Sequence, residues 1–199
     1  QDFSWLDTSK VAKMYKTFYR TKSTQLDVSN WDLSNVTSFS QTFAQADGYT
    51  GTGLETWGLA PKAAEAKEMF WGCKNLNVSM SNMQLPKVKN AQAMFERCEN
   101  AEFDPPGEMF TGQASNASNM FRNCYKFNGN IGGFRMGFLH YASNMFNNCR
   151  AFNPDSFQNA DWTGQKMSSH GAQNMFTNCR QFNQSLAVLP RGFFKKVAF

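Results

Sequence analysis

A motif that recurs at a nearly constant interval constrains the fold of this chain more than any other feature. Its clearest copies read Asn-Met-Phe-x-Asn-Cys, and looser copies precede them along the chain. Each copy is keyed on one phenylalanine, and these key residues are Phe18, Phe43, Phe70, Phe95, Phe121, Phe146 and Phe176. Successive key phenylalanines are 25, 27, 25, 26, 25 and 30 residues apart. An interval of this length predicts a repeat architecture, in which each unit stacks on the next.

Apolar and small residues within each unit recur at a helical interval. They stand seven and four residues before the key phenylalanine, at the phenylalanine itself, and three residues after it. This spacing predicts a short helix of about three turns. Apolar residues separated by Asn, Gly and Ser follow it and predict a very short strand, which forms a parallel ladder with its copies. We therefore expect an α/β solenoid of about seven repeats over residues 1–190, with strands on one face and helices on the other.

Two further features complete the expected architecture. Tryptophans end the strand-like stretch in several units, where their bulk is expected to fill the gap between the strand and helix layers, and they are Trp5, Trp31, Trp57 and Trp162. Residues 191–199 do not follow the repeat. They either cover the exposed core of the last unit, as terminal repeats require, or form a basic aromatic tail that docks elsewhere.

The second unit carries a resemblance to a known family. Trp31-Asp32-Leu33-Ser34-Asn35-Val36-Thr37, followed by Phe43, resembles the WDxSNVTxM...MF unit of the BspA-like leucine-rich-repeat family. The Asn-Met-Phe copies resemble the second half of that unit, so the resemblance extends over roughly residues 2 to 190. It implies a right-handed leucine-rich-repeat-like solenoid. It also implies a surface-exposed or secreted protein of bacteria or microbial eukaryotes, used for adhesion and protein binding, with no catalytic residues.

The five cysteines share one position in the repeat, three residues after the key phenylalanine. They are Cys73, Cys98, Cys124, Cys149 and Cys179. Because equivalent positions stack in a repeat protein, we expect a structural column of buried thiols that act as small hydrophobic groups. A disulfide framework and a metal site are the alternatives, although an interval of about 25 residues lacks the close Cys-x-x-Cys pairs of zinc sites. We predict no metal and no cofactor.

Basic residues supply the candidate partner-binding surface of this chain, whose formal charge is +5. Lys13, Lys16 and Arg20 fall on one side of the first expected helix and could meet an acidic protein or an anionic lipid surface. The alternative is a solvated face. The tail adds four candidate residues, which are Phe193, Phe194, Lys195 and Lys196. The chain lacks the dense basic runs typical of nucleic-acid binders, and no segment approaches the roughly 20 apolar residues that span a bilayer.

The chain shows no catalytic constellation, so we predict that it is not an enzyme. His140 and His170 share one repeat position, and they are either a pH-sensitive or metal-binding pair or two solvated residues. The leading hypothesis is a protein–protein interaction or adhesion module. The alternative is a peripheral structural or accessory subunit of a large assembly, such as a membrane-attached organelle or photosynthetic complex. The first residue is Gln, which predicts a processed chain or a fragment, located at the cell surface, outside the cell or in an organelle lumen.

Overall fold

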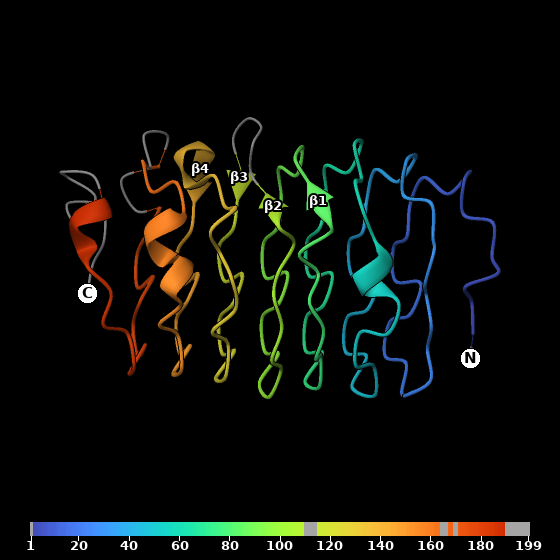
Figure 1. Ribbon diagram of the computed structural model, residues 1–199, viewed down its shortest axis with the longest axis horizontal. Helices are drawn as coiled ribbons and strands as arrows, with labels where there is room; N and C mark the ends of the chain where they lie inside the picture. Colours follow the sequence, from blue (N-terminus) through green and yellow to red (C-terminus); the bar gives the residue numbers. More distant parts are fainter. Residues whose placement is uncertain (1, 110–114, 164–166, 169–170, 190–199) are drawn as a thin grey trace.

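The repeats lie side by side in a row along the longest dimension of the molecule (Figure 1). The computed structural model describes residues 2–109, 115–163, 167–168 and 171–189. Each unit is a narrow loop, and backbone hydrogen bonds join it to the next. The Phe43 N–H, for example, donates to the Met69 carbonyl at 2.8 Å, and the Phe70 N–H donates to the Met94 carbonyl at 2.8 Å. The described chain therefore progresses by one loop per repeat from one end of the row to the other.

The predicted fold class, a right-handed leucine-rich-repeat-like α/β solenoid, is wrong. No α-helix occurs among the described residues, where the only helices are short 3-10 helices. These are η1 (Leu54–Thr56), η2 (Met136–Phe138), η3 (Asp155–Asn159) and η4 (Leu186–Val188). The segment around each key phenylalanine, where a helix of about three turns was expected, is a succession of tight turns. Most of the described chain is turn or irregular backbone, so the helical face of such a solenoid does not form.

Left-handed residues two positions before and two positions after each key phenylalanine exclude the helix. Positive φ angles occur there at Lys16, Arg20, Gln41, Gln45, Glu68, Gly72, Ala93, Arg97, Asn119, Asn123, Asn144, Asn148, Asn174 and Asn178. Hydrogen bonds close turns around them, as from the Cys98 N–H to the Phe95 carbonyl at 3.1 Å, with Arg97 between them. A positive φ at the third residue of a four-residue turn is the type II arrangement. An α-helix needs a negative φ at every residue, so it cannot pass these positions.

The apolar positions that suggested a helix are nevertheless the buried ones. Val36, Phe39, Phe43 and Ala46 are all fully buried. Consecutive turns also point a side chain inward every three or four residues, so they produce the same interval of burial as a helix. The sequence periodicity reports which side chains face the core and leaves the backbone conformation open.

The key phenylalanines form one column through the core. Neighbouring rings have centroids between 5.3 and 5.7 Å apart and are inclined by only 3–17°. The five central rings are fully buried, while Phe18 and Phe176 at the two ends are partly buried. A second column is formed by Phe127, Phe152 and Phe182, with centroids 6.0 and 5.8 Å apart. Each ring thus packs between rings of the preceding and the following repeat, which fixes the order and the register of the row.

The tryptophans follow their prediction only in part. Trp31 and Trp57 are buried and stacked, with ring centroids 6.0 Å apart, and Trp162 is also buried. Trp5 is 75% exposed, so the expectation that it fills the core is wrong. It belongs to the first unit, where no earlier repeat among the described residues covers it.

Short parallel pairings join the repeats along one edge of the row, the upper edge in Figure 1. Strand β1 (Gln84–Leu85) pairs with β2 (Glu108–Met109), and β3 (Ser115–Asn116) pairs with β4 (Leu139–Tyr141). Elsewhere the pairing is reduced to isolated parallel bridges, such as Lys13 with Ser38 and Ser38 with Glu65. Because each loop turns again within a few residues, the pairings remain too short to build an extended sheet.

Candidate functional site

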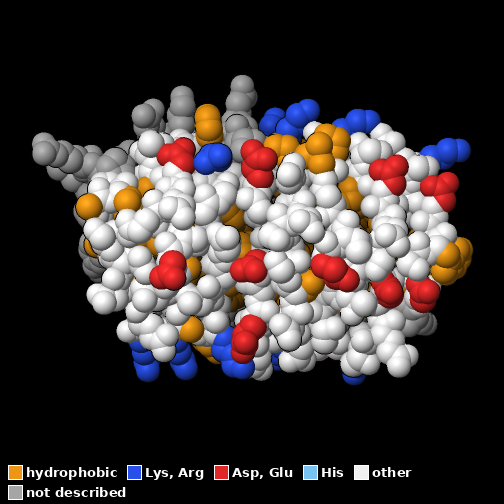
Figure 2. All heavy atoms as spheres, viewed as in Figure 1, with side chains coloured by type: hydrophobic (Ala, Val, Ile, Leu, Met, Phe, Trp, Pro, Cys, Tyr) orange, Lys and Arg blue, Asp and Glu red, His pale blue; other side chains and the backbone are white. Residues whose placement is uncertain are grey.

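Charged side chains are distributed unevenly over the row of repeats. On the face seen in Figure 2, Asp and Glu side chains form a line across the middle, while Lys and Arg side chains gather along the two long edges. The binding sites for negatively charged groups should therefore lie at the edges of the row, where basic side chains are concentrated.

The predicted basic stripe does not form, because it presupposed a helix. Lys13, Lys16 and Arg20 are all exposed, but the turns direct them to different places. Lys13 lines one groove, Arg20 lines a separate hollow, and Lys16 lies between two tyrosines, with its Nζ 5.2 Å from the Tyr15 ring centroid and 5.1 Å from that of Tyr19. The sequence analysis missed these tyrosines, although their alternation with basic residues was a visible signal.

The groove that contains Lys13 is the largest apolar-lined hollow on the described surface near the stripe. We call it the N-terminal groove, of about 750 Å³, lined by Lys13, Tyr15, Thr37, Ser38, Ser40, Gln41, Ala64, Glu65 and Lys67. It follows the line of parallel bridges across the first three repeats. Tyr15 is 59% exposed at this groove. Three repeats thus combine to present one exposed aromatic ring flanked by polar and charged side chains.

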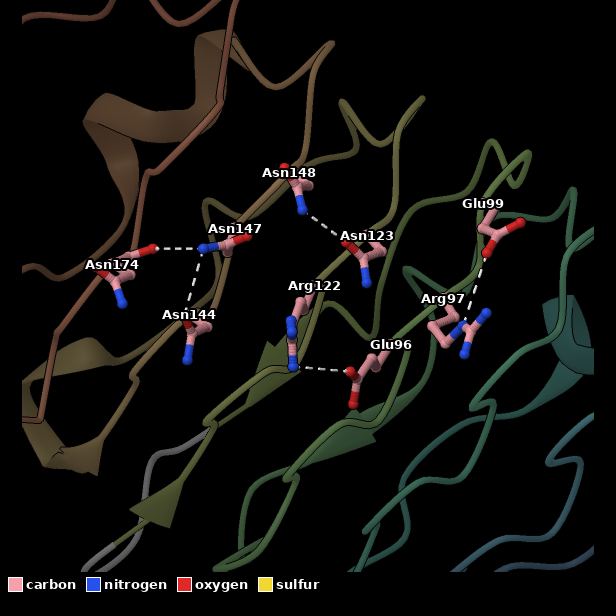
Figure 3. A network of polar contacts seen from close by, with 9 residues as sticks. All are labelled: Glu96, Arg97, Glu99, Arg122, Asn123, Asn144, Asn147, Asn148 and Asn174. Carbon is pink, nitrogen blue, oxygen red and sulfur yellow. Dashed lines mark hydrogen bonds and ion pairs between the residues drawn. The ribbon is translucent and has the colours of Figure 1, made fainter. Parts of the chain in front are cut away.

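Side chains of the last repeats bond to one another instead. Asn148 Nδ2 donates to Asn123 Oδ1 at 2.8 Å, and Asn178 Nδ2 donates to Asn148 Oδ1 at 2.8 Å. Figure 3 shows the first of these bonds beside that of Asn147 Nδ2 to the Asn174 carbonyl, at 3.5 Å. This asparagine ladder holds neighbouring turns together, and its amides are already engaged within the protein.

Ion pairs cross the middle of the same surface (Figure 3). Arg122 Nη1 lies 3.6 Å from Glu96 Oε1, and Arg97 Nε lies 3.7 Å from Glu99 Oε1. Burial raises the pKa of Glu96, and the guanidinium of Arg122 opposes that rise. Ion pairs this exposed typically contribute at most about 1 kcal/mol each, so they orient side chains more than they stabilise the fold.

The five cysteines are free and line up behind the phenylalanine column. Each Sγ donates to the carbonyl of the key phenylalanine one repeat earlier, at 2.8–3.2 Å, as Cys98 does to Phe70. Burial raises the pKa of Cys73, Cys98 and Cys149, and raises that of Cys179 to about 12. A thiol that remains protonated is a poor nucleophile and a poor metal ligand, so the column acts in packing.

The remaining candidates give no further site. His140 Nδ1 lies 3.4 Å from the Phe138 carbonyl. His170, Phe193, Phe194, Lys195 and Lys196 lie outside the described residues, as does the whole segment 191–199. Within the described ranges, no three His, Cys, Asp or Glu side chains come together as a metal site would require. No helix in that part of the chain is long and apolar enough to span a bilayer.

Comparison with known proteins gives one match. A family model described as "Mycoplasma protein of unknown function, DUF285" matches residues 1–107 and 107–189. No curated protein matches the chain, and no solved structure matches it. The matched segments cover the whole row of repeats described above.

Proposed function

This chain belongs to the family described as Mycoplasma protein of unknown function, DUF285, and from that premise we propose that it is a non-enzymatic recognition module, which binds a protein partner through the N-terminal groove. The observation that carries the proposal is the exposed Tyr15 in a groove built by three repeats. Tyrosine combines a large apolar surface with a polar tip, and it is enriched at protein interfaces.

The backbone of the groove supports the proposal because it is held in place before any partner arrives. The Met14 N–H donates to the Ser38 carbonyl at 2.9 Å, and the Phe39 N–H donates to the Glu65 carbonyl at 2.8 Å. A groove fixed in this way loses little conformational entropy on binding. The resemblance to BspA-like repeats, which implies adhesion and protein binding, points in the same direction.

The charges of the groove indicate the kind of partner. Lys13 and Lys67 line it and Lys16 covers the Tyr15 ring, against one lining carboxylate, that of Glu65. Lys67 Nζ lies 3.7 Å from the Glu68 carboxylate. A complementary partner offers an apolar group to Tyr15 and carboxylates to the lysines, and its association rate falls as salt is added.

Photo-crosslinking tests the proposal. A photoreactive aromatic residue is placed at position 15 and, as a matched control, at Tyr141, which is 52% exposed near the other end of the row. We expect one discrete protein adduct from position 15, reduced by Lys13→Glu and by added salt, and none from position 141. The same adducts from both positions, or no effect of Lys13→Glu, would contradict the proposal.

A second candidate function is a permanent subunit of a larger assembly. Exposed apolar side chains at the first repeat favour it, since Trp5 is 75% and Leu6 is 40% exposed. Apolar groups of this size at one end of a row are suited to permanent cover by another subunit. Native size analysis of the endogenous protein separates the two candidates. A recognition module is found free as well as bound, whereas a subunit always co-purifies with one large complex.

A further inference from the structure

Arg20 belongs to a second hollow, which shares no residue with the N-terminal groove. This basic hollow has a volume of about 350 Å³ and is lined by Arg20, Lys22, Gln45, Asp47, Trp71, Gly72, Lys74 and Arg97. Four cations surround it against the single carboxylate of Asp47. We propose that it binds a small hydroxylated ring, such as a sugar or cyclitol, that carries sulfate or phosphate esters.

The hollow exists because one side chain is missing from a row. Arg20, Gln45, Gly72 and Arg97 occupy the same position, two residues after the key phenylalanine, in the first four repeats. Gly72 leaves space between its neighbours, and a Cβ added there would lie 3.6 Å from the Gln45 side chain. Inter-repeat bonds fix the spacing, since the Gln45 N–H donates to the Trp71 carbonyl at 2.6 Å and the Gly72 N–H to the Glu96 carbonyl at 2.8 Å. Gly72 therefore forms the floor of a preformed cavity of the size that small ligands occupy.

The cations around this floor are positioned for an anion. Arg20 Nε donates to Gln45 Oε1, and its guanidinium carbon lies 5.1 Å from the Tyr19 ring centroid, which orients the group. Arg97 is oriented by Glu99 through its Nε. Among the described residues, Lys22 and Lys74 take part in no ion pair. Ester oxygens would receive charge-assisted hydrogen bonds from this set, which are stronger than neutral ones.

Two other groups restrict the ligand further. The indole of Trp71 is half-buried and offers an apolar surface on which a ring can pack. Asp47 would repel a bare inorganic anion, but its carboxylate can accept hydrogen bonds from ring hydroxyls. A ligand with hydroxyls and anionic esters on one ring satisfies all of these groups. The sulfate and phosphate forms offer the same oxygens, and experiment must separate them.

Calorimetric titration with defined probes tests the site. The probes are fructose 1,6-bisphosphate for the phosphate form and the trisulfated heparin disaccharide for the sulfate form, with glucose as the uncharged control. We expect at least one anionic probe to bind, glucose not to bind, and the affinity to fall as salt is added. Lys74→Ala and Arg97→Gln should each weaken binding by roughly tenfold or more, as loss of a charge-assisted bond does.

Two variants control for charge and for shape. Lys87→Ala removes an equal charge from an exposed lysine outside the hollow and should leave the affinity unchanged. Gly72→Asn fills the floor while keeping every cation, and asparagine already occupies the equivalent position at Asn123, Asn148 and Asn178 with positive φ. It should abolish binding in a folded protein.

The outcomes decide both the site and the source of the ester. Preference for one probe identifies the phosphate or the sulfate form. Absence of binding by both anionic probes overturns the proposal, and so does equal binding to the Lys74→Ala, Gly72→Asn and Lys87→Ala variants. Lys13→Glu, which impairs the groove, should leave these titrations unchanged, so a failure here and a failure of the protein-binding proposal are distinguishable.

Discussion

Replacing Gly72 by alanine distinguishes turns from a helix around the key phenylalanines, because the two backbones predict effects of opposite sign. In a helix interior, a glycine-to-alanine change stabilises by about 1 kcal/mol. Gly72 instead has φ +73°, and a left-handed alanine costs roughly 1–2 kcal/mol. Alanine also restricts the unfolded chain, which returns about 0.4–1 kcal/mol. The net expectation for Gly72→Ala is a loss of about 0.8 kcal/mol of unfolding free energy.

The size of this loss can be assigned to the backbone. The new Cβ would lie 3.6 Å from the Gln45 side chain, which is an ordinary contact, so no clash contributes. Gly72→Asn is the matched control, because asparagine enters the left-handed region more readily than alanine. In turns the expected order of stability is glycine, then asparagine, then alanine. In a helix the order would be alanine, then asparagine, then glycine.

Urea unfolding followed by circular dichroism measures the order. Comparing midpoints at constant slope reports stability without changes in the unfolded state, and thermal midpoints should fall by about 2–4 °C per kcal/mol for a chain of this length. An alanine variant more stable than the parent, or an asparagine variant less stable than the alanine one, would refute the turn description.

Two other predictions concern the core columns. Phe121 is fully buried between Phe95 and Phe146, so Phe121→Ala should cost about 3–5 kcal/mol in urea unfolding, and Phe18→Ala at the partly buried end roughly half as much. Equal losses would contradict a column with distinct ends. Since burial raises the pKa of Cys73 above its ordinary 9.0, thiols ionise first in the unfolded chain, and stability should fall as pH rises above about 9, by at most about 1.4 kcal/mol per pH unit for each such thiol. Urea midpoints that stay constant from pH 7 to 10 would count against this reasoning.

The arrangement of the core was predictable where it depended on the recurrence of one residue. The interval between key phenylalanines is enough to place their rings in contact, because equivalent positions in stacked repeats adjoin. The backbone was harder to predict. Asparagines beside Phe121 and Phe146 do signal left-handed turns, since asparagine is a poor helix former that tolerates positive φ. In the first repeat, however, Lys16 and Arg20 hold the same positions, and both are good helix formers. There the hydrogen bonds between repeats override the local preference.

The candidate sites were less predictable than the core, because residues from several repeats build them. Lys13, Ser38 and Glu65 meet in the N-terminal groove although they are 25 and 27 residues apart in sequence. Only the register of the bridges shows that they adjoin. The basic hollow depends on the absence of a side chain at Gly72, and sequence alone does not reveal a space until the neighbours of that glycine are known.

The phenylalanine column also determines where the molecule can accept extra residues. The interval from Phe146 to Phe176 is 30 residues rather than 25, yet their ring centroids are only 5.7 Å apart and the rings incline by 3°. The additional chain is accommodated outside the column without widening it. Insertions can therefore diversify the outer loops while the pitch of the row stays constant, much as pages of different width can share one binding.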